Sequence, residues 1–307
     1  MKRRFCLASA TCLVLTLLLA PSAWADQPLG INLGYTSFMD GAPPAGPGFY
    51  LAEYLAYRSA YGVRNNPVDA SDPHLDVWVN LNQFLYQSDT PILFGGKWGL
   101  DVIVPFVSIR GEPAPLPDDN GGMGDLTVGP YLQWDPIMGK NGPIFMHRIE
   151  LQTIWPTGHY TDEKLLNPGA NHFSFNPYWA GTFFFTPQWT ASWRLHYLWN
   201  ADNDEPFVGF GVNKVEPGQA FHANFASSYE VVPKMLRLGA NGYYLVEITE
   251  SKHDGVKQGR EEVLGIGPGL LFSFSQNTHV FFNSYFETDV HYRPQGNLFV
   301  LRLVHHF

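Results

Sequence analysis

QWTASWRLHYLWN, residues 188–200, decides the fold because polar and large apolar residues nearly alternate along it. A β-strand points successive side chains to opposite faces. One face carries Trp189, Ala191, Trp193, Leu195, Tyr197 and Trp199, and the other carries Gln188, Thr190, Ser192, Arg194, His196 and Asn200. A soluble sandwich would bury the aromatic face against a second sheet, whereas a membrane barrel would turn it to lipid and keep the polar face in the lumen.

The first 25 residues have the pattern of a secretory signal peptide. A basic start (residues 2–4) precedes an apolar run (5–20) and an A-x-A motif (23–25), after which we expect cleavage. The apolar run is shorter than the roughly 20 residues of a membrane-spanning helix, which argues against an uncleaved anchor. Cys6 and Cys12 both lie in the segment to be removed, so the mature chain would contain no disulfide, thiolate metal site or cysteine nucleophile.

The charge balance excludes nucleic acid as a partner. Of the 19 Lys and Arg residues, 3 lie in residues 1–25, which contain no acid, so 16 bases face 28 acids in the mature chain. The resulting net charge of −12 is opposite to the basic surface that nucleic acid requires. After residue 25 no apolar run is long enough to span a membrane as a helix, so any crossing has to be made by strands.

Period-two patterning with turn residues between segments predicts an all-β protein, a transmembrane antiparallel up-and-down β-barrel of about twelve strands. We expect the barrel over residues 49–307, with strands at 49–59, 75–87, 94–108, 124–135, 143–155, 172–185, 188–200, 218–231, 235–249, 260–274, 278–290 and 297–307.

The connections between these segments alternate in length. The long ones are 60–74, 109–123, 156–171, 201–217 and 250–259, and the short ones are 88–93, 136–142, 186–187, 232–234 and 275–277. Barrels of the Gram-negative outer membrane have short periplasmic turns and long external loops, whereas a sandwich has no reason to alternate in this way. We therefore expect a lipid-embedded outer-membrane barrel, although the connection at 291–296 is shorter than the alternation requires.

Seven short motifs occur in order along the chain: PGFY (47–50), GDLTVGP (124–130), PTGHY (156–160), GANHFSFNP (169–177), GANGYY (239–244), GIGPGL (265–270) and RPQG (293–296). Together they resemble the family of outer-membrane transport proteins named for the meta pathway of phenol degradation. The resemblance implies uptake of small hydrophobic or aromatic compounds, without fixing the solute, and it implies no cofactor. The C-terminal segment that ends at Phe307 resembles the signal through which the outer-membrane assembly machinery recognises barrels.

Polar and charged residues that keep to one face of the strands are the candidate lumen-lining residues. They are Arg148, Glu150, Arg194, His196, Glu230, Arg237, Glu247, Glu287, Asp289 and Arg302. These side chains could set the route of a solute, or they could pair with one another, because a closed polar interior needs such partners.

His172 and Ser174 form an H-x-S pair on one face of a strand, and a Ser nucleophile beside a His base is the pair used in acyl transfer. An outer-membrane esterase or deacylase is therefore the alternative to a channel. The sequence identifies no acid that would orient the histidine, so a polar lumen contact is the preferred interpretation.

Residues 26–48 are rich in Gly and Pro and have no sheet periodicity. This segment either extends into the periplasm or folds into the lumen as a plug. A structural barrel with a lumen sealed in this way is the third functional possibility.

Overall fold

The computed structural model describes residues 31–41, 45–63, 74–113, 116 and 119–307. The predicted signal peptide, residues 1–25, lies outside the described residues, as does the start of the segment at 26–48. No described helix is long and apolar enough to span a membrane.

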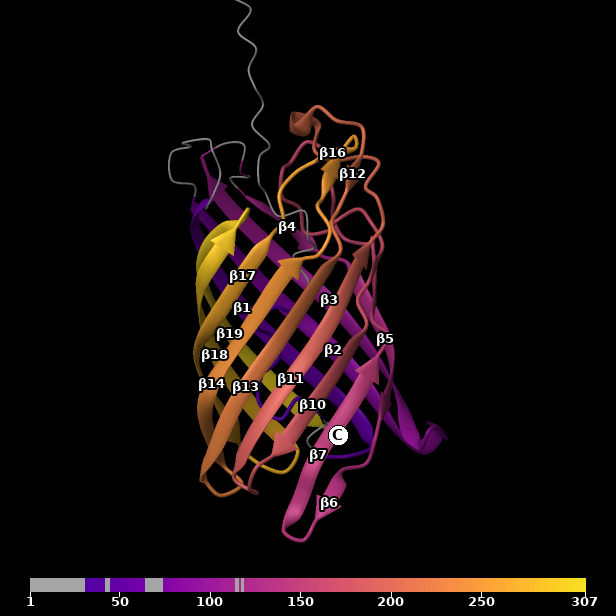
Figure 1. The fold of residues 1–307 in the computed structure, drawn as a ribbon, viewed down its shortest axis with the longest axis vertical. Coiled ribbons are helices and arrows are strands. Elements are labelled where there is room, and N and C mark those ends of the chain that lie inside the picture. The colour runs from indigo at the N-terminus through magenta and orange to yellow at the C-terminus, as the bar shows by residue number, and fades with distance from the viewer. Residues whose placement is uncertain (1–30, 42–44, 64–73, 114–115, 117–118) are drawn as a thin grey trace, which may run out of the picture.

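The described chain forms a closed antiparallel barrel of 12 strands, as predicted (Figure 1). Nine of the 12 barrel strands are continuous: β1 (Gly48–Val63), β2 (His74–Leu93), β3 (Gly96–Glu112), β11 (Trp189–Asn200), β13 (Ala220–Val232), β14 (Leu236–Glu247), β17 (Glu262–Ser273), β18 (Thr278–His291) and β19 (Pro294–His306). The other three are pairs of shorter segments: β4 (Asn120–Met123) with β5 (Leu126–Gln133), β7 (Gly142–Glu150) with β8 (Thr153–Trp155), and β9 (Ser174–Phe175) with β10 (Tyr178–Phe184).

The first and last strands close the barrel. β1 pairs with β19 from Tyr50 opposite His306 to Val63 opposite Pro294, and every other barrel strand pairs with the strands before and after it in the sequence. Closure leaves no sheet edge with unpaired backbone groups, which is the condition for crossing lipid with strands. β1 begins and β19 ends at the same end of the barrel, which we call the short-turn end; the opposite end is the long-loop end (Figure 1).

Each of the twelve strands expected from the sequence coincides with one barrel strand, and the expected and observed bounds differ at the strand ends. β2 continues to Leu93, so the turn expected at 88–93 is reduced to Phe94 and Gly95, both with positive φ. The turn expected at 136–142 contains β6 (Ile137–Gly139), which pairs with β7. Hairpin ends that extend beyond the membrane have water on both faces, so the alternation that reveals a strand is lost there.

The long-loop end carries structure that the sequence pattern did not reveal. β12 (Val215–Glu216), β15 (Lys252–His253) and β16 (Val256–Lys257) form a separate three-stranded sheet, and η1 (Val208–Phe210) is a single 3-10 turn (Figure 1). These strands of two residues are too short to show any periodicity.

Strand β11 confirms the prediction that its polar residues face the lumen and its large apolar residues face outward. Thr190, Ser192, Arg194 and His196 are each at most 4 % exposed, because they point into the barrel. Trp189, Tyr197 and Trp199, on the other face, are 39–46 % exposed. Leu198 is the apolar exception on the inner face, where it is fully buried.

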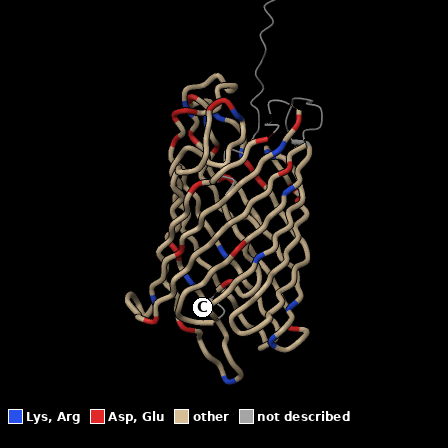
Figure 2. The backbone as a smooth tube through the Cα atoms, turned by 180° about the vertical axis from the view of Figure 1, so that it is seen from behind, with Lys and Arg blue, Asp and Glu red and all other residues tan. Residues whose placement is uncertain are grey.

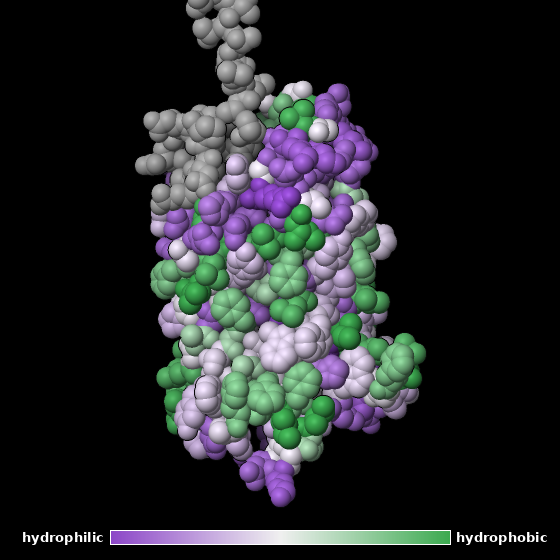
Figure 3. Space-filling view, in the orientation of Figure 1, coloured by the Kyte–Doolittle hydropathy of each residue, from purple (hydrophilic) through white to green (hydrophobic). Residues whose placement is uncertain are grey.

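Large apolar side chains cover the outside of the barrel. Exposed outward residues include Trp78, Phe84, Leu100, Phe106, Trp179, Phe225, Phe282 and Leu301. Figure 3 shows, on the face in view, a belt of apolar residues between more polar ends, and Figure 2 shows charged residues gathered largely in the loops and turns. This distribution is that of a lipid-facing surface.

The three barrel strands that consist of two segments lie next to one another, and side chains at the interruptions form hydrogen bonds between them. Between β4 and β5, the two carboxylate oxygens of Asp125 accept hydrogen bonds from the backbone N–H groups of Gly158 (2.9 Å) and Ala170 (2.7 Å). Between β9 and β10, Asn176 donates from its backbone to Gln152 O (2.8 Å) and from its side chain to Gln152 Oε1 (3.0 Å). Three of the motifs that carry the family resemblance, at 124–130, 156–160 and 169–177, therefore meet in one region of the wall.

Candidate functional site: the lumen and its N-terminal segment

Residues 31–41 of the N-terminal segment lie inside the barrel. The backbone of this segment donates from Gly34 N to Asn224 Oδ1 (2.7 Å), from Met39 N to Ser192 Oγ (3.0 Å) and from Gly41 N to Thr182 Oγ1 (2.9 Å). Tyr35 and Phe38 are 7 % and 1 % exposed, because they fill the space between the walls. Residues 31–41 pair with no strand, so side chains of the wall provide most of their polar contacts.

One ion pair holds Asp40, near the end of the stretch 31–41. Asp40 accepts from Nε and Nη2 of Arg194, both at 2.7 Å, and the two side chains are almost completely buried. The Arg194 guanidinium also lies 4.1 Å from the centre of the Tyr178 ring. Burial alone would raise the pKa of Asp40, but the attraction of Arg194, with smaller contributions from Arg148 and Arg302, outweighs it and holds that pKa below the usual range of a carboxyl group.

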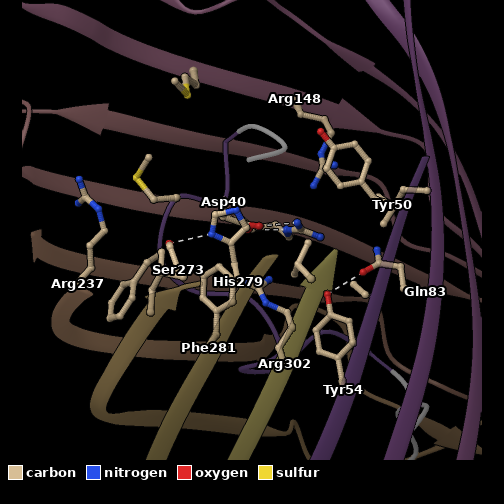
Figure 4. Close-up of a pocket in the computed structure, with 18 of the residues that line it drawn as sticks. Asp40, Tyr50, Tyr54, Gln83, Arg148, Arg237, Ser273, His279, Phe281 and Arg302 are labelled. Atoms are coloured by element: carbon tan, nitrogen blue, oxygen red, sulfur yellow. Dashed lines mark hydrogen bonds and ion pairs between the residues drawn. The ribbon is translucent and has the colours of Figure 1, made fainter. Parts of the chain in front are cut away.

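A cavity of about 250 Å³ lies next to this ion pair (Figure 4). Its lining includes Lys234 and Met235, which connect β13 to β14 at the short-turn end. The N-terminal segment contributes Phe38, Met39 and Asp40 to its lining, and the wall contributes aromatic, aliphatic and basic side chains. An apolar cavity of about 150 Å³ is large enough to hold benzene. The cavity therefore has room for a substituted ring.

The structure gathers only some of the predicted lumen residues around this cavity. Arg148, Arg194, Glu230, Arg237 and Arg302 line it. The first two and Arg302 lie near Asp40, whereas Glu230 and Arg237 face each other across β13 and β14 at the short-turn end. Glu150 is fully buried behind the cavity, where it accepts hydrogen bonds from Tyr178 (2.5 Å) and Gln152 (3.3 Å).

The remaining predicted acids lie towards the long-loop end. Glu287 accepts from Arg58 (2.9 Å), from the Tyr243 hydroxyl (2.7 Å) and from Gly296 N (2.6 Å). Glu247 accepts from Glu261 N (3.0 Å).

Asp289 departs from the prediction of a lumen position. Its φ is +51°, and the register between β17 and β18 is irregular near this point. The side chain is exposed and lies 3.3 Å from His291, because the irregularity reverses the parity that the sequence pattern assumed.

His196 belongs to a stacked histidine pair. Its ring lies 4.1 Å from that of His222, and Nδ1 of His196 and Nε2 of His222 lie 3.1 and 3.0 Å from one acceptor, Asn176 Oδ1. All three side chains are buried. Among the described residues, no group of three or more His, Cys, Asp or Glu side chains is arranged to hold a metal ion.

His172 and Ser174 are both buried. The Ser174 hydroxyl donates to Asn200 Oδ1 at 2.6 Å. A serine nucleophile gives its proton to the base that activates it. In this structure the proton is directed to an amide oxygen, which is not a base.

Asp40, Asp101 and Asp125 have contacts that the sequence pattern did not single out. Asp101 accepts from Gln83 (2.6 Å), whose Oε1 in turn accepts from the Tyr54 hydroxyl (2.7 Å). Alternation could have placed Asp101 on the inner face. Asp40 lies outside any strand, so no periodic signal could have found it.

Comparison with known proteins shows the family. The family model described as "Putative MetA-pathway of phenol degradation" matches residues 59–303, so the chain belongs to this family. No curated protein sequence matches it.

Among solved structures, the fold is similar to an outer membrane channel from Pseudomonas putida F1, with 18% identity over 89% of this chain and 99% of the other, and a TM-score of 0.76. It is also similar to the translocator domain of the autotransporter NalP from Neisseria meningitidis, with 9% identity over 85% and 89% of the two chains and a TM-score of 0.50. Likeness at these identities is a likeness of fold.

Proposed function

We propose that this protein is an outer-membrane channel for small hydrophobic or aromatic compounds, and that the N-terminal segment, described over residues 31–41, gates its lumen. Membership of the phenol-degradation family and the apolar belt around a closed barrel support the location and the solute class. The observation that carries the proposal is the cavity at the short-turn end, because rings and aliphatic groups share its lining with charged side chains and the N-terminal segment bounds it. A solute held there would lie on a route along the barrel axis.

The proposal that the segment is a gate rests on the contacts that attach it to the barrel. Residues 31–41 contribute no strand to the sheet, and their polar anchors are hydrogen bonds to wall side chains and the Asp40–Arg194 pair. A typical intramolecular hydrogen bond contributes a net stability of only about 1 kcal/mol. Release of the segment breaks these contacts and exposes Tyr35 and Phe38, but it breaks no strand pairing of the barrel.

The test is solute flux into liposomes that carry the refolded mature protein. We expect phenol to enter faster than glucose, and we expect both rates to rise when residues 26–47 are deleted, since β1 begins at Gly48. Equal rates for protein-containing and protein-free liposomes in both forms would contradict the channel.

We further propose that the chain is not an enzyme and that Ser174 has a structural role, on the strength of its hydrogen bond to Asn200. Recognition of the C-terminus by the assembly machinery is also a proposal. Phe307 is 73 % exposed, although its backbone N–H donates to Phe49 O (3.0 Å).

A further inference from the structure

The cavity at the short-turn end is lined by more positive than negative groups. Five cationic side chains border it, Arg148, Arg194, Lys234, Arg237 and Arg302, against the two carboxylates of Asp40 and Glu230. The charge is unbalanced although the whole chain is acidic. Such an excess inside a partly enclosed space attracts an anion.

Two of these arginines are buried without an ionic partner. Arg148 and Arg302 are each 6 % exposed, and neither forms an ion pair with a carboxylate among the residues that the structure describes. Nε of each has no hydrogen-bond acceptor there. A buried charge is costly unless it is paired and hydrogen-bonded, so a carboxylate that reached these groups would gain strong, charge-assisted hydrogen bonds.

Aromatic rings hold both guanidinium groups in place. Arg302 lies 3.7 Å from the centre of the Phe281 ring, and Arg148 lies 5.0 Å from that of Tyr131. Figure 4 shows Arg148 and Arg302 extending from different sides of the lumen towards Asp40. Stacking fixes the plane of a guanidinium while its N–H groups stay free to bind an anion.

Asp40 shows what this cluster binds. Its carboxylate, supplied by the N-terminal segment, makes two 2.7 Å hydrogen bonds to the third arginine, Arg194. The nearby carboxylates of Glu150 and Asp101 attract Arg148 without an ion-pair contact, and their hydrogen bonds come from Tyr178 and Gln83. The cluster is thus a carboxylate site in which Arg194 is paired from within the chain, while Arg148 and Arg302 have no carboxylate in direct contact.

The rest of the cavity suits the apolar part of a ligand. Phe38, Met39, Met235, Leu271 and Phe281 line it. Its volume of about 250 Å³ exceeds that of the roughly 150 Å³ cavity known to hold benzene.

From this combination we propose that the cavity binds small aromatic carboxylates, with the carboxylate on Arg302 and Arg148 and the ring against Phe281, Leu271 and Met235. The inference rests on the proposed channel, since it names the solute class that the lumen holds before release at the short-turn end. It places the bound carboxylate beside Asp40, whose negative charge acts on the same two arginines from a distance and opposes binding.

Binding can be measured directly by equilibrium dialysis of labelled benzoate against the refolded mature protein in detergent micelles at neutral pH, with uncharged benzamide as the matched probe. We expect benzoate to bind at least tenfold more tightly than benzamide. Arg302→Gln should weaken benzoate binding at least tenfold and leave benzamide binding unchanged, and Arg302→Lys should restore part of the loss. Lys140→Gln, which removes the same charge at an exposed hairpin residue, should change neither.

A second variant tests the site without removing an arginine. Asp40→Asn should raise benzoate affinity several-fold, because it removes the internal carboxylate. Equal affinity for benzoate and benzamide, or unchanged benzoate binding in a folded Arg302→Gln protein, would overturn the inference. Phenol flux separates it from the channel proposal: absent flux with benzoate bound as expected contradicts the channel and leaves the carboxylate site in place.

Discussion

The depth of two tryptophans on β11 gives a quantitative test of the membrane orientation. Trp189 and Trp193 lie on the same outward face, four residues apart. A strand rises about 3.3 Å per residue and is tilted by about 40° in such barrels, so the two side chains differ by about 10 Å in depth. The apolar band is about 25 Å tall, which puts Trp193 near the midplane and Trp189 at the edge.

The expected costs follow from this difference. An arginine on the lipid face costs about 2–4 kcal/mol at the midplane and about 0–1 kcal/mol near the interface. Each tryptophan also has packing partners, Phe145 and Trp179 for Trp193 and Phe185 for Trp189. The alanine variant at each site removes this packing, so the difference between the Arg and Ala variants isolates the cost of the charge.

Urea unfolding of the Arg and Ala variants at Trp189 and Trp193, in lipid vesicles, provides the free energies of unfolding. We expect the Arg-minus-Ala difference to be about 2–4 kcal/mol at Trp193 and within about 1 kcal/mol at Trp189. Equal differences at the two positions would refute the assigned depth, and a negligible difference at both would refute the lipid-facing orientation of β11.

Further outcomes follow from the described contacts. Arg194→Ala should destabilise the barrel by about 3–5 kcal/mol in urea unfolding, because it leaves the buried Asp40 carboxylate without its partner. Adding Asp40→Asn should recover part of this loss. Additive costs of the two substitutions would count against the pair. The pKa of Asp40 is lowered in the folded protein, so its attachment to Arg194 is complete above the usual carboxyl pKa and is lost as the pH falls through the lowered value. Phenol flux should thus be constant near neutral pH and rise only in strong acid, whereas Asp40→Asn should show the raised flux throughout; an acid response that survives in the variant would exclude this group. Asp125→Ala should cost about 2–5 kcal/mol in urea unfolding, since two backbone N–H groups lose their acceptor, and Asp125→Asn should cost less. Ser174→Ala should leave hydrolysis of p-nitrophenyl esters at the wild-type background, and a loss of turnover would support the esterase alternative.

The barrel could be predicted from sequence because lipid and lumen impose opposite requirements on alternate residues. In β11 this alternation is nearly unbroken from Trp189 to Asn200, and it gave both the strand and its faces. The prediction failed where the solvent is the same on both sides, as in β6, or where an irregular register reverses parity, as at Asp289.

The contents of the lumen could be predicted only in part. Parity marked Arg148, Arg194 and Arg302 as inward-facing, but it could not show that they meet around Asp40. Asp40 is 154 residues from Arg194 in the chain and lies in a segment without periodicity. Pairing of that kind depends on the closed three-dimensional fold and leaves no local signal in the sequence.

The central claim is that the N-terminal segment must move for a solute to pass, and a reversible crosslink tests it most directly. Met39 N lies 3.0 Å from Ser192 Oγ, and residues 26–307 contain no cysteine, so Met39→Cys with Ser192→Cys supplies two neighbouring thiols that a short, reducible bifunctional thiol reagent can join between segment and barrel. The account predicts that phenol flux into liposomes falls to the protein-free rate when this variant is crosslinked and returns on reduction, while each single-cysteine variant keeps its flux after the same treatment. Undiminished flux through the fully crosslinked variant would contradict the account.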